Sequence, residues 1–296
     1  MRRAQGPEQP ESRARHGARR AIAGPTPPSH DHFEEIVMSS VLITGASRGI
    51  GRAVATELAA RGHRVVATAR RPEDLAGLPV DQALRLDVTD PESIEQALRD
   101  AGEIDVLVSN AGATVRAPLE SVPMAEVEAL FDLNTFGALR VAQGVLPAMR
   151  RRGAGRLLFV SSVQGRITVP MIGPYAASKW ALEALAETLA VEAGHFGVKV
   201  SLLQPGSVSS GGPERAKSFF AEDDPYLPLF QQFGPLRGTG IFEPITPEEV
   251  AVAVADTVER PDPPLRVPVG APARTALEAR KAASETAPFV PVAIDW

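Results

Sequence analysis

VLITGASRGIG, residues 41–51, joins a short apolar run to a glycine-rich turn and then opens a segment of helical period. Glycines at such a place allow a tight turn and let the backbone approach a pyrophosphate, which then lies on the N–H groups and positive dipole end of the helix. A glycine-rich link between a strand and a helix also occurs as an ordinary connection, so this motif gains its weight from its position and flanks. It predicts a dinucleotide site that begins with Gly45, Ser47, Arg48, Gly49, Ile50 and Gly51.

Outward from this turn, short apolar runs alternate with amphipathic stretches along the chain. We expect strands at Val41–Thr44, Arg64–Ala69, Ala83–Leu86, Asp105–Ser109, Arg156–Ser161, Val198–Gln204 and Leu265–Val269. We expect helices at Gly49–Arg61, Pro91–Ala101, Met124–Arg151, Pro174–Gly194 and Pro247–Val258. Strands that alternate with helices predict right-handed βαβ units and a parallel sheet covered on both faces. The expected fold is therefore α/β: a doubly wound, Rossmann-type seven-stranded parallel sheet in a single domain over residues 38–296.

Residues 1–37 differ in composition from all that follows, because they are rich in Arg, Pro, Gly and Ala and show no helical or strand period. Such a composition predicts a disordered N-terminal arm. A basic organelle-targeting leader is one alternative, although acidic residues interrupt it. We favour a second alternative, in which Met38 is the true start, because MSSVLITGAS leads directly into the first strand.

Composition and charge argue against several classes of function. The chain of 296 residues has a net charge of −5 and a pI near 5.7, whereas a nucleic-acid partner requires a basic face. It has no cysteine, and its five histidines are scattered without ligand spacing, so we expect no disulfide and no metal site. No apolar run approaches the roughly 18–20 residues of a membrane span. These features predict a cytoplasmic protein without a membrane span.

The end of the second expected strand indicates which cofactor is preferred. Dinucleotide folds place the residue that reads the adenosine ribose about 20 residues past the turn, an acid for a 2′-hydroxyl or an arginine for a 2′-phosphate. Here the strand ends in Arg70 and Arg71 without a carboxylate, and Arg48 can approach from the other side. The arginines could instead be surface charges at a strand end. We interpret them as favouring NADP(H).

Tyr175 and Lys179 are the candidate chemical groups, because a spacing of four residues puts them on one face of a helix. A nearby cation favours the phenolate, which brings a pKa near 10 towards the working range and lets the phenol exchange a proton with an alcohol or carbonyl oxygen. Ser161 and Ser162 end the preceding expected strand, where ligands bind in such sheets. Taken separately, a Tyr–Lys pair also occurs by chance on solvated helices, and serines also cap turns.

From about Val41 to Gly270 the chain resembles the short-chain dehydrogenase/reductase family, in its compact single-domain branch. The motifs that carry the resemblance are TGASRGIG at 44–51, Asp87-Val88, NAG at 110–112, Asn134 in LNTFG, Ser162, YAASK at 175–179 and Pro205-Gly206. Their order and spacing together are specific to the family. The stretch from Phe159 to Gly206 is similar in particular to the 17β-hydroxysteroid and retinol dehydrogenase group.

The resemblance implies roles for the matching residues. Tyr175 would be the general acid/base, and Lys179 would lower its pKa and hold the nicotinamide ribose. Ser162 would orient the substrate oxygen, with Ser161 as a structural neighbour, and Asn134 would hold a water of a proton relay. Further cofactor contacts would be Asp87, Val88, Asn110, Ala111, Gly112, Pro205, Gly206, Val208 and Ser210, the last standing where the family often has threonine.

Residues 207–245 form a long segment in which the sheet pattern lapses and aromatic residues gather. Long connections of this kind are often functional, so we expect a lid over an apolar substrate. The alternative is that its aromatic side chains pack on the domain or on another subunit. The aromatic and aliphatic residues concerned are Phe219, Phe220, Tyr226, Leu227, Leu229, Phe230, Phe233 and Phe242. Val163, Met171 and Ile172 would add apolar wall, and Glu222, Asp223 and Asp224 are expected to be solvated.

These features lead to one hypothesis and two alternatives. We expect an NADP(H)-dependent oxidoreductase acting on a small hydrophobic ketone or alcohol that is steroid-like, retinoid-like or long-chain. A 3-oxoacyl reductase is one alternative, although it would need a basic entrance rather than an acidic loop. A non-catalytic NADP(H)-sensing protein is the other, although such proteins typically lose the tyrosine or lysine. By resemblance, residues 124–151 and 174–194 would pair across a two-fold axis, giving a homodimer or homotetramer.

Overall fold

The computed structural model describes residues 38–210, 216–232, 243–286 and 288–289. The expected N-terminal arm, residues 1–37, and the aromatic residues Phe233 and Phe242 lie outside these ranges, and the side chain of Phe230 is not described. One compact unit begins at Ile36.

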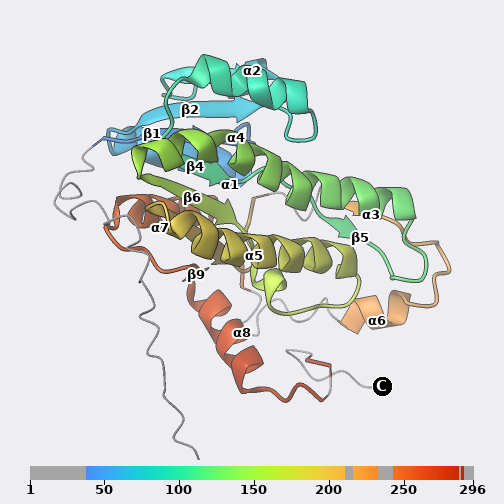
Figure 1. Cartoon of the computed structure of the whole chain (residues 1–296). Coiled ribbons are helices and arrows are strands. Elements are labelled where there is room, and N and C mark those ends of the chain that lie inside the picture. The colour runs from blue at the N-terminus through green and yellow to red at the C-terminus, as the bar shows by residue number, and fades with distance from the viewer. Residues whose placement is uncertain (1–37, 211–215, 233–242, 287, 290–296) are drawn as a thin grey trace, which may run out of the picture. The chain divides into compact units, whose positions relative to one another are not determined.

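A seven-stranded, all-parallel sheet forms the centre of this unit (Figure 1). Its strands are β1 (Ser40–Ile43), β2 (Arg64–Ala69), β3 (Gln82–Arg85), β4 (Val106–Ser109), β6 (Gly155–Val160), β7 (Val198–Pro205) and β9 (Arg266–Val269). Their order in the sheet is β3-β2-β1-β4-β6-β7-β9. The order reverses beside β1, as in a doubly wound sheet, so the predicted fold class is confirmed. Each strand lies within one residue of its expected bounds.

Helices cover both faces of the sheet. The α-helices are α1 (Gly49–Ala60), α2 (Pro91–Ala101), α3 (Met124–Phe131), α4 (Gly137–Arg152), α5 (Gly173–Gly194), α6 (Leu227–Gln232), α7 (Pro247–Glu259) and α8 (Ala271–Ala282). Alternate side chains of a strand point to opposite faces, so Val41 and Ile43 pack with α1 and α7, whereas Leu42 packs with α2, α4 and α5. Figure 1 shows α4 and α5 beside one another over that second face.

Local capping explains why two helix starts could be predicted. At α2, the Asp90 carboxylate accepts hydrogen bonds from the N–H groups of Glu92 and Ser93. At α7, Thr246 and Glu249 form a reciprocal capping box. Such caps satisfy N–H groups that have no partner inside the helix.

Three features differ from the sequence-based expectations. The helix expected over 124–151 is interrupted by a π-helical segment, Asp132–Phe136, between α3 and α4. The segment 207–245 contains regular structure, because β8 (Lys217–Ser218) pairs in parallel with β5 (Val115–Arg116) and α6 follows it. The Ala- and Pro-rich region after Gly270, for which no element was predicted, forms α8.

Candidate active site

The glycine-rich turn after β1 has a backbone that favours glycine. Gly45 and Gly49 have φ angles of +70° and +53°, in the left-handed region that costs other residues energy. A side chain on Gly51 would collide with the Gly45 carbonyl and with the side-chain amide of Asn110. The turn thus packs tightly against the N-terminus of α1, where free N–H groups can bind an anion. The remaining predicted residues of this turn lie in the same place: Ser47 and Ile50 half-buried, and Arg48 exposed as the N-cap residue.

The predicted segment Asn110–Gly112 follows β4 and braces this turn. The Asn110 side chain donates to the Thr44 and Gly45 carbonyl oxygens, at 3.0 and 3.1 Å. The Thr44 hydroxyl accepts from the N–H groups of Asn110 and Ala111. These hydrogen bonds fix the two strand ends on either side of the point where the sheet order reverses.

Arg70 directly follows β2 and is exposed. In the described part of the chain its side chain forms no hydrogen bond or ion pair, although its charge acts on Asp87. Arg71 differs, because its guanidinium makes two hydrogen bonds of 3.0 Å to the Asp74 carboxylate. Arg70, which the sequence analysis predicts as the cofactor-binding residue, is therefore available to an anionic ligand, whereas Arg71 is engaged by Asp74.

Asp87 and Val88 lie after β3 at the same edge. Partial burial opposes ionisation of Asp87, but hydrogen bonds from Thr89 and the charges of Arg70 and Arg85 lower its pKa below the ordinary value. The Val88 side chain is 4% exposed and packs where Gly137 leaves room at the start of α4.

The segment after β7 returns to the glycine-rich turn. Pro205 ends β7, and Gly206 lies against Ala273 of α8. Val208 is buried and bridges to Ile245. Ser210 reaches α1, because a Cβ built on Gly49 would lie 3.2 Å from the Ser210 Cβ.

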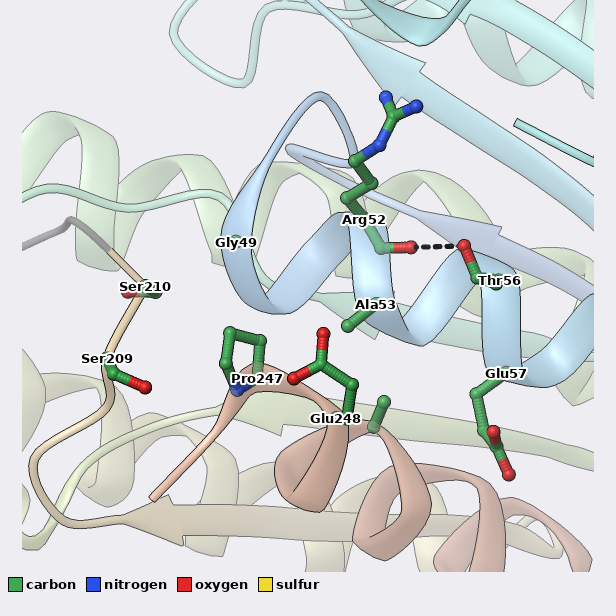
Figure 2. A pocket seen from close by; sticks show the side chains of 10 residues that line it. Gly49, Arg52, Ala53, Thr56, Glu57, Ser209, Ser210, Pro247 and Glu248 are labelled. Atoms are coloured by element: carbon green, nitrogen blue, oxygen red, sulfur yellow. Dashed lines mark hydrogen bonds between the residues drawn. The ribbon is translucent and has the colours of Figure 1, made fainter. Parts of the chain in front are cut away.

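A groove of about 390 Å³ lies beside this contact, between α1 and the start of α7. Figure 2 shows Pro247 and Glu248 facing Gly49 and Ala53 across it, with Ser209 and Ser210 at one end. Its lining is mostly polar or small, which does not suit a large apolar substrate.

Tyr175 stands in the first turn of α5, whose start is set by Gly173 and Pro174. Burial raises the pKa of its phenol above 10, and a hydrogen bond with the Ser162 hydroxyl opposes this rise. Lys179 is not among the groups that shift this pKa, so the expected lowering of the Tyr175 pKa by Lys179 stays a prediction. The Lys179 Nζ lies 5.9 Å from the centre of the tyrosine ring and donates to the Val160 carbonyl oxygen at 2.8 Å.

Lys179 is 5% exposed and carries its charge into the protein interior. Burial lowers the pKa of its ammonium to about 8, and the negative charge of Glu183 opposes this fall. At pH 7 the protonated form still prevails, so a cation stands one helical turn below the phenol.

Ser162 is buried beyond the end of β6. Its hydroxyl accepts from the Gln164 N–H at 3.1 Å, lies 3.4 Å from the Pro205 carbonyl oxygen and forms the hydrogen bond with Tyr175. Ser162 and Tyr175 therefore present two hydroxyls side by side at the carboxyl end of the sheet.

Asn134 lies in the π-helical segment, and its side chain is 1% exposed. The amide oxygen accepts from the Ala113 N–H at 2.9 Å, while the amide nitrogen donates to the Ala113 carbonyl and to the Ser178 hydroxyl, both at 3.0 Å. The Ser178 hydroxyl in turn donates to the Tyr175 carbonyl at 2.7 Å. Asn134 thus ties α5 to the segment after β4, and its expected water contact stays a prediction.

The sequence analysis missed a buried carboxylate, Glu183, below Lys179. It is 2% exposed and accepts hydrogen bonds from Ser161, Gln204 and Arg266. A signal was available, because Glu183 lies four residues after Lys179 and so shares its helical face. Its partners could not be found in that way, since they come from distant strands.

The substrate side is only partly described. Phe219 and Phe220 are half-buried after β8, and Val163 and Met171 are buried near Ser162 and Tyr175 in the sequence. Asp224 was expected to be solvated, but it is 6% exposed, so that prediction is wrong. Its carboxylate accepts from the Tyr226 N–H at 2.9 Å, which forms an Asx turn.

Two classes of feature are not found among the described residues. No group of three or more His, Cys, Asp or Glu side chains there could hold a metal ion. Likewise, none of the helices described is long and apolar enough to cross a bilayer.

Comparison with known proteins finds relatives that are named as dehydrogenases or reductases. The short chain dehydrogenase family model matches residues 39–218, which include the glycine-rich turn and Tyr175. The chain is 34% identical over 241 residues to 3-ketodihydrosphingosine reductase of Bacteroides thetaiotaomicron, covering 78% of this chain and 87% of that protein. It is 38% identical over 248 residues to human retinol dehydrogenase 8, with coverage of 77% and 80%. It is also 38% identical over 251 residues to mouse 17-beta-hydroxysteroid dehydrogenase type 1, with coverage of 76% and 72%.

Solved structures agree with this match. A short-chain dehydrogenase from Streptomyces avermitilis is 36% identical, with a TM-score of 0.71 and coverage of 81% of this chain and 91% of that one. An alcohol dehydrogenase from Thermococcus sibiricus, complexed with 5-hydroxy-NADP, is 28% identical with a TM-score of 0.63, over 78% and 95% of the two chains.

Proposed function

The chain belongs to the short-chain dehydrogenase family of nicotinamide-dependent oxidoreductases, and we propose that it interconverts an apolar ketone and its alcohol with NADP(H). The observation that carries this proposal is the hydrogen bond between Ser162 and Tyr175, with the Lys179 ammonium one turn below. Two hydroxyls at the carboxyl end of the sheet can both donate to one substrate oxygen. A nicotinamide cofactor, when bound, supplies or accepts the hydride.

In the direction of reduction, Tyr175 gives its phenol proton to the carbonyl oxygen of the substrate. Because burial raises the pKa of the phenol, Tyr175 is protonated at neutral pH and can act as a general acid. The Ser162 hydroxyl holds the same oxygen and stabilises the charge that develops on it. The Lys179 cation stabilises the phenolate that remains after proton transfer.

The preference for NADP(H) rests on charge at the end of β2. Arg70 is exposed, and Arg48 is the exposed N-cap residue of α1, while β2 ends without the carboxylate that would repel a 2′-phosphate. Arg70→Ala should weaken NADPH binding by about 10- to 100-fold, because a charge-assisted hydrogen bond is lost, and should leave NADH binding nearly unchanged. Arg71→Ala is the matched control, since Asp74 already engages that side chain. Equal loss for both cofactors would contradict the assignment.

The substrate class is proposed from the apolar residues around the site and from the relatives. Val163 and Met171 are buried, and Phe219 and Phe220 are half-buried on the following segment. The relatives named above act, by their names, on a ketosphingoid base, retinol or a 17β-hydroxysteroid. We therefore expect a long-chain, retinoid-like or steroid-like carbonyl or alcohol, rather than a charged sugar.

A turnover screen with NADPH against long-chain, steroid, retinoid, 3-oxoacyl and small-ketone panels tests this proposal. Tyr175→Phe should abolish turnover of the best substrate while the variant still binds NADPH, because only the acidic hydroxyl is removed. A Tyr175→Phe enzyme with wild-type turnover would refute the assigned chemistry, and preference for 3-oxoacyl substrates would favour that alternative.

We also propose that two copies associate through α4 and α5. Trp180 and Val191 on α5 are 41% and 76% exposed, and Phe136 beside the start of α4 is 48% exposed. Light scattering should give a dimer or tetramer mass, and Val191→Glu should reduce it. A monomeric wild-type protein at micromolar concentration would contradict this.

A further inference from the structure

A third functional group shares the helical face of Tyr175 and Lys179. Glu183 lies four residues beyond Lys179 on α5 and is 2% exposed. Removing a carboxylate from water is costly unless hydrogen bonds and charges compensate it. Its retention below the catalytic lysine therefore requires a set of partners.

Those partners come from three neighbouring strands. The Glu183 carboxylate accepts from the Ser161 hydroxyl at 3.0 Å, beyond the end of β6, and from the Gln204 amide at 2.6 Å, on β7. Its other oxygen accepts from the Arg266 guanidinium at 2.9 Å, on the edge strand β9. Gly165 makes room for the contact, because a Cβ there would lie 2.9 Å from both Glu183 Oε1 and the Ser161 hydroxyl.

The contact with Ser161 matters because of its neighbours in the chain. The carbonyl of the preceding residue, Val160, accepts the hydrogen bond from Lys179. The hydroxyl of the following residue, Ser162, forms the hydrogen bond with Tyr175. The hydrogen bond that Ser161 donates to Glu183 therefore holds the centre of a three-residue segment, Val160–Ser162, whose two ends contact Lys179 and Tyr175.

Glu183 also sets the electric field at Lys179. Its negative charge favours the ammonium and so opposes the lowering of the pKa that burial causes. Arg266 lies on the other side of the carboxylate and is shared with Glu187, whose carboxylate accepts from it at 2.6 Å. Among the described residues that pack here, Gln204 on β7, Gln164 after Ser162 and Asn134 in the π-helical segment are uncharged. Arg166, two residues after Gln164, is charged, and its charge acts on Glu187. The same neighbourhood contains Tyr175, which is protonated at neutral pH.

We propose that Glu183 is a positioning residue for this reaction, which holds the Val160–Ser162 segment against Lys179 and Tyr175 and balances the buried lysine charge. This inference rests on the proposed function, in which those two side chains perform the proton transfer. Arg266, on the edge strand β9, contributes by holding the Glu183 carboxylate in place.

The test combines kinetics with a direct titration of Lys179. The chain has four lysines, Lys179, Lys199, Lys217 and Lys281, so ε-carbon-labelled lysine gives few NMR signals, and Lys179→Met assigns the relevant one. Glu183→Gln should lower the titration midpoint of Lys179, because a negative charge is removed, whereas Arg266→Gln should raise it. In kinetics, Glu183→Gln should reduce kcat by about 10- to 100-fold through misplacement of the reacting groups, and its alkaline activity limb should move to lower pH.

Two further variants separate position from charge. Ser161→Ala removes the hydrogen bond but keeps the carboxylate, so kcat should fall while the Lys179 titration stays in place. Glu187→Gln is the matched control, because Glu187 lies one turn further along α5 and its side chain is 56% exposed. In the described part of the chain, Glu187 makes no hydrogen bond with Ser161. It should leave kcat nearly unchanged.

The outcomes are distinguishable. A folded Glu183→Gln protein with wild-type kcat and an unmoved Lys179 signal would overturn the inference. If Glu183→Gln fails to fold, Arg266→Gln and Ser161→Ala decide, and an unchanged titration in the first together with unchanged kcat in the second would overturn it. Failure of the proposed function would look different, because the Lys179 titration would still shift while the wild-type enzyme turned over no carbonyl substrate.

Discussion

Replacing Lys179 by methionine should remove activity and yet stabilise the folded protein at neutral pH. Burial lowers the pKa of this lysine from an ordinary 10.5 to about 8. At about 1.4 kcal/mol for each pH unit, the charged ammonium costs the folded state on the order of 3 kcal/mol. Methionine has a similar length and fills the space without a charge. It leaves the Val160 carbonyl without a donor, at a cost of about 1–2 kcal/mol, so the net gain is about 1–2 kcal/mol.

The dependence on pH follows from the direction of the pKa shift. Because the folded-state pKa lies below the unfolded-state value, the unfolded chain binds more protons between pH 8 and 10.5. The cost of the buried charge is therefore fully present below about pH 8 and disappears as the pH rises through 10.5. The advantage of Lys179→Met over the wild type should shrink across that window.

Urea unfolding, followed by fluorescence at a series of pH values from 7 to about 10.5, measures this difference directly. Near neutral pH the melting temperature of Lys179→Met should exceed that of the wild type by about 2–6 °C. Lys281→Met, at an exposed position of α8, is the control and should show no such pH-dependent difference. A Lys179→Met variant that is less stable than the wild type by the same amount at every pH would refute the reasoning.

Three further predictions concern the turn, the π-helical segment and a helix cap. Gly51→Ala should cost about 1–3 kcal/mol of stability and weaken binding of either cofactor, because its methyl group would collide with the Gly45 carbonyl; a calorimetric titration with wild-type affinity would contradict this. Asn134→Ala should destabilise by about 2–4 kcal/mol, since two backbone groups of Ala113 lose their partner; urea unfolding with an unchanged midpoint would count against it. Thr246→Ala should cost about 1 kcal/mol through loss of the α7 cap, with kcat unaffected; a loss of turnover would show that α7 has a closer role.

The sheet and most helices could be predicted because their signals are local. The apolar runs that became β1 and β2 are buried on both faces, and the starts of α2 and α7 carry their own caps at Asp90 and Thr246. The two-residue strands β5 and β8 are too short to show a period, and they pair across about 100 residues of sequence. Likewise, the composition after Gly270 gave no element, although Ala273 and Ala276 are buried within α8.

The candidate site, like the fold, could be predicted only in part. The order of the motifs placed Ser162, Tyr175 and Lys179 in one site, because the carboxyl ends of parallel strands converge. Their electrostatics could not be predicted from spacing, since burial decides the direction of both the Tyr175 and the Lys179 pKa. The partners of Glu183 come from β6, β7 and β9, and only the folded sheet brings these strands together.

The small sheet of β5 and β8 connects the segment after β7 with the residues that lead into α5. The Arg116 carbonyl accepts from the Phe219 N–H, and the next residue, Ala117, donates to the Met171 carbonyl, each at 2.9 Å. One short strand therefore touches both the segment expected to cover the substrate and the residue that precedes the catalytic helix by two positions. Substitution of residues 216–219 to accept a new substrate would therefore also displace the start of α5, which carries Tyr175. We expect such substitutions to change substrate preference and turnover rate together.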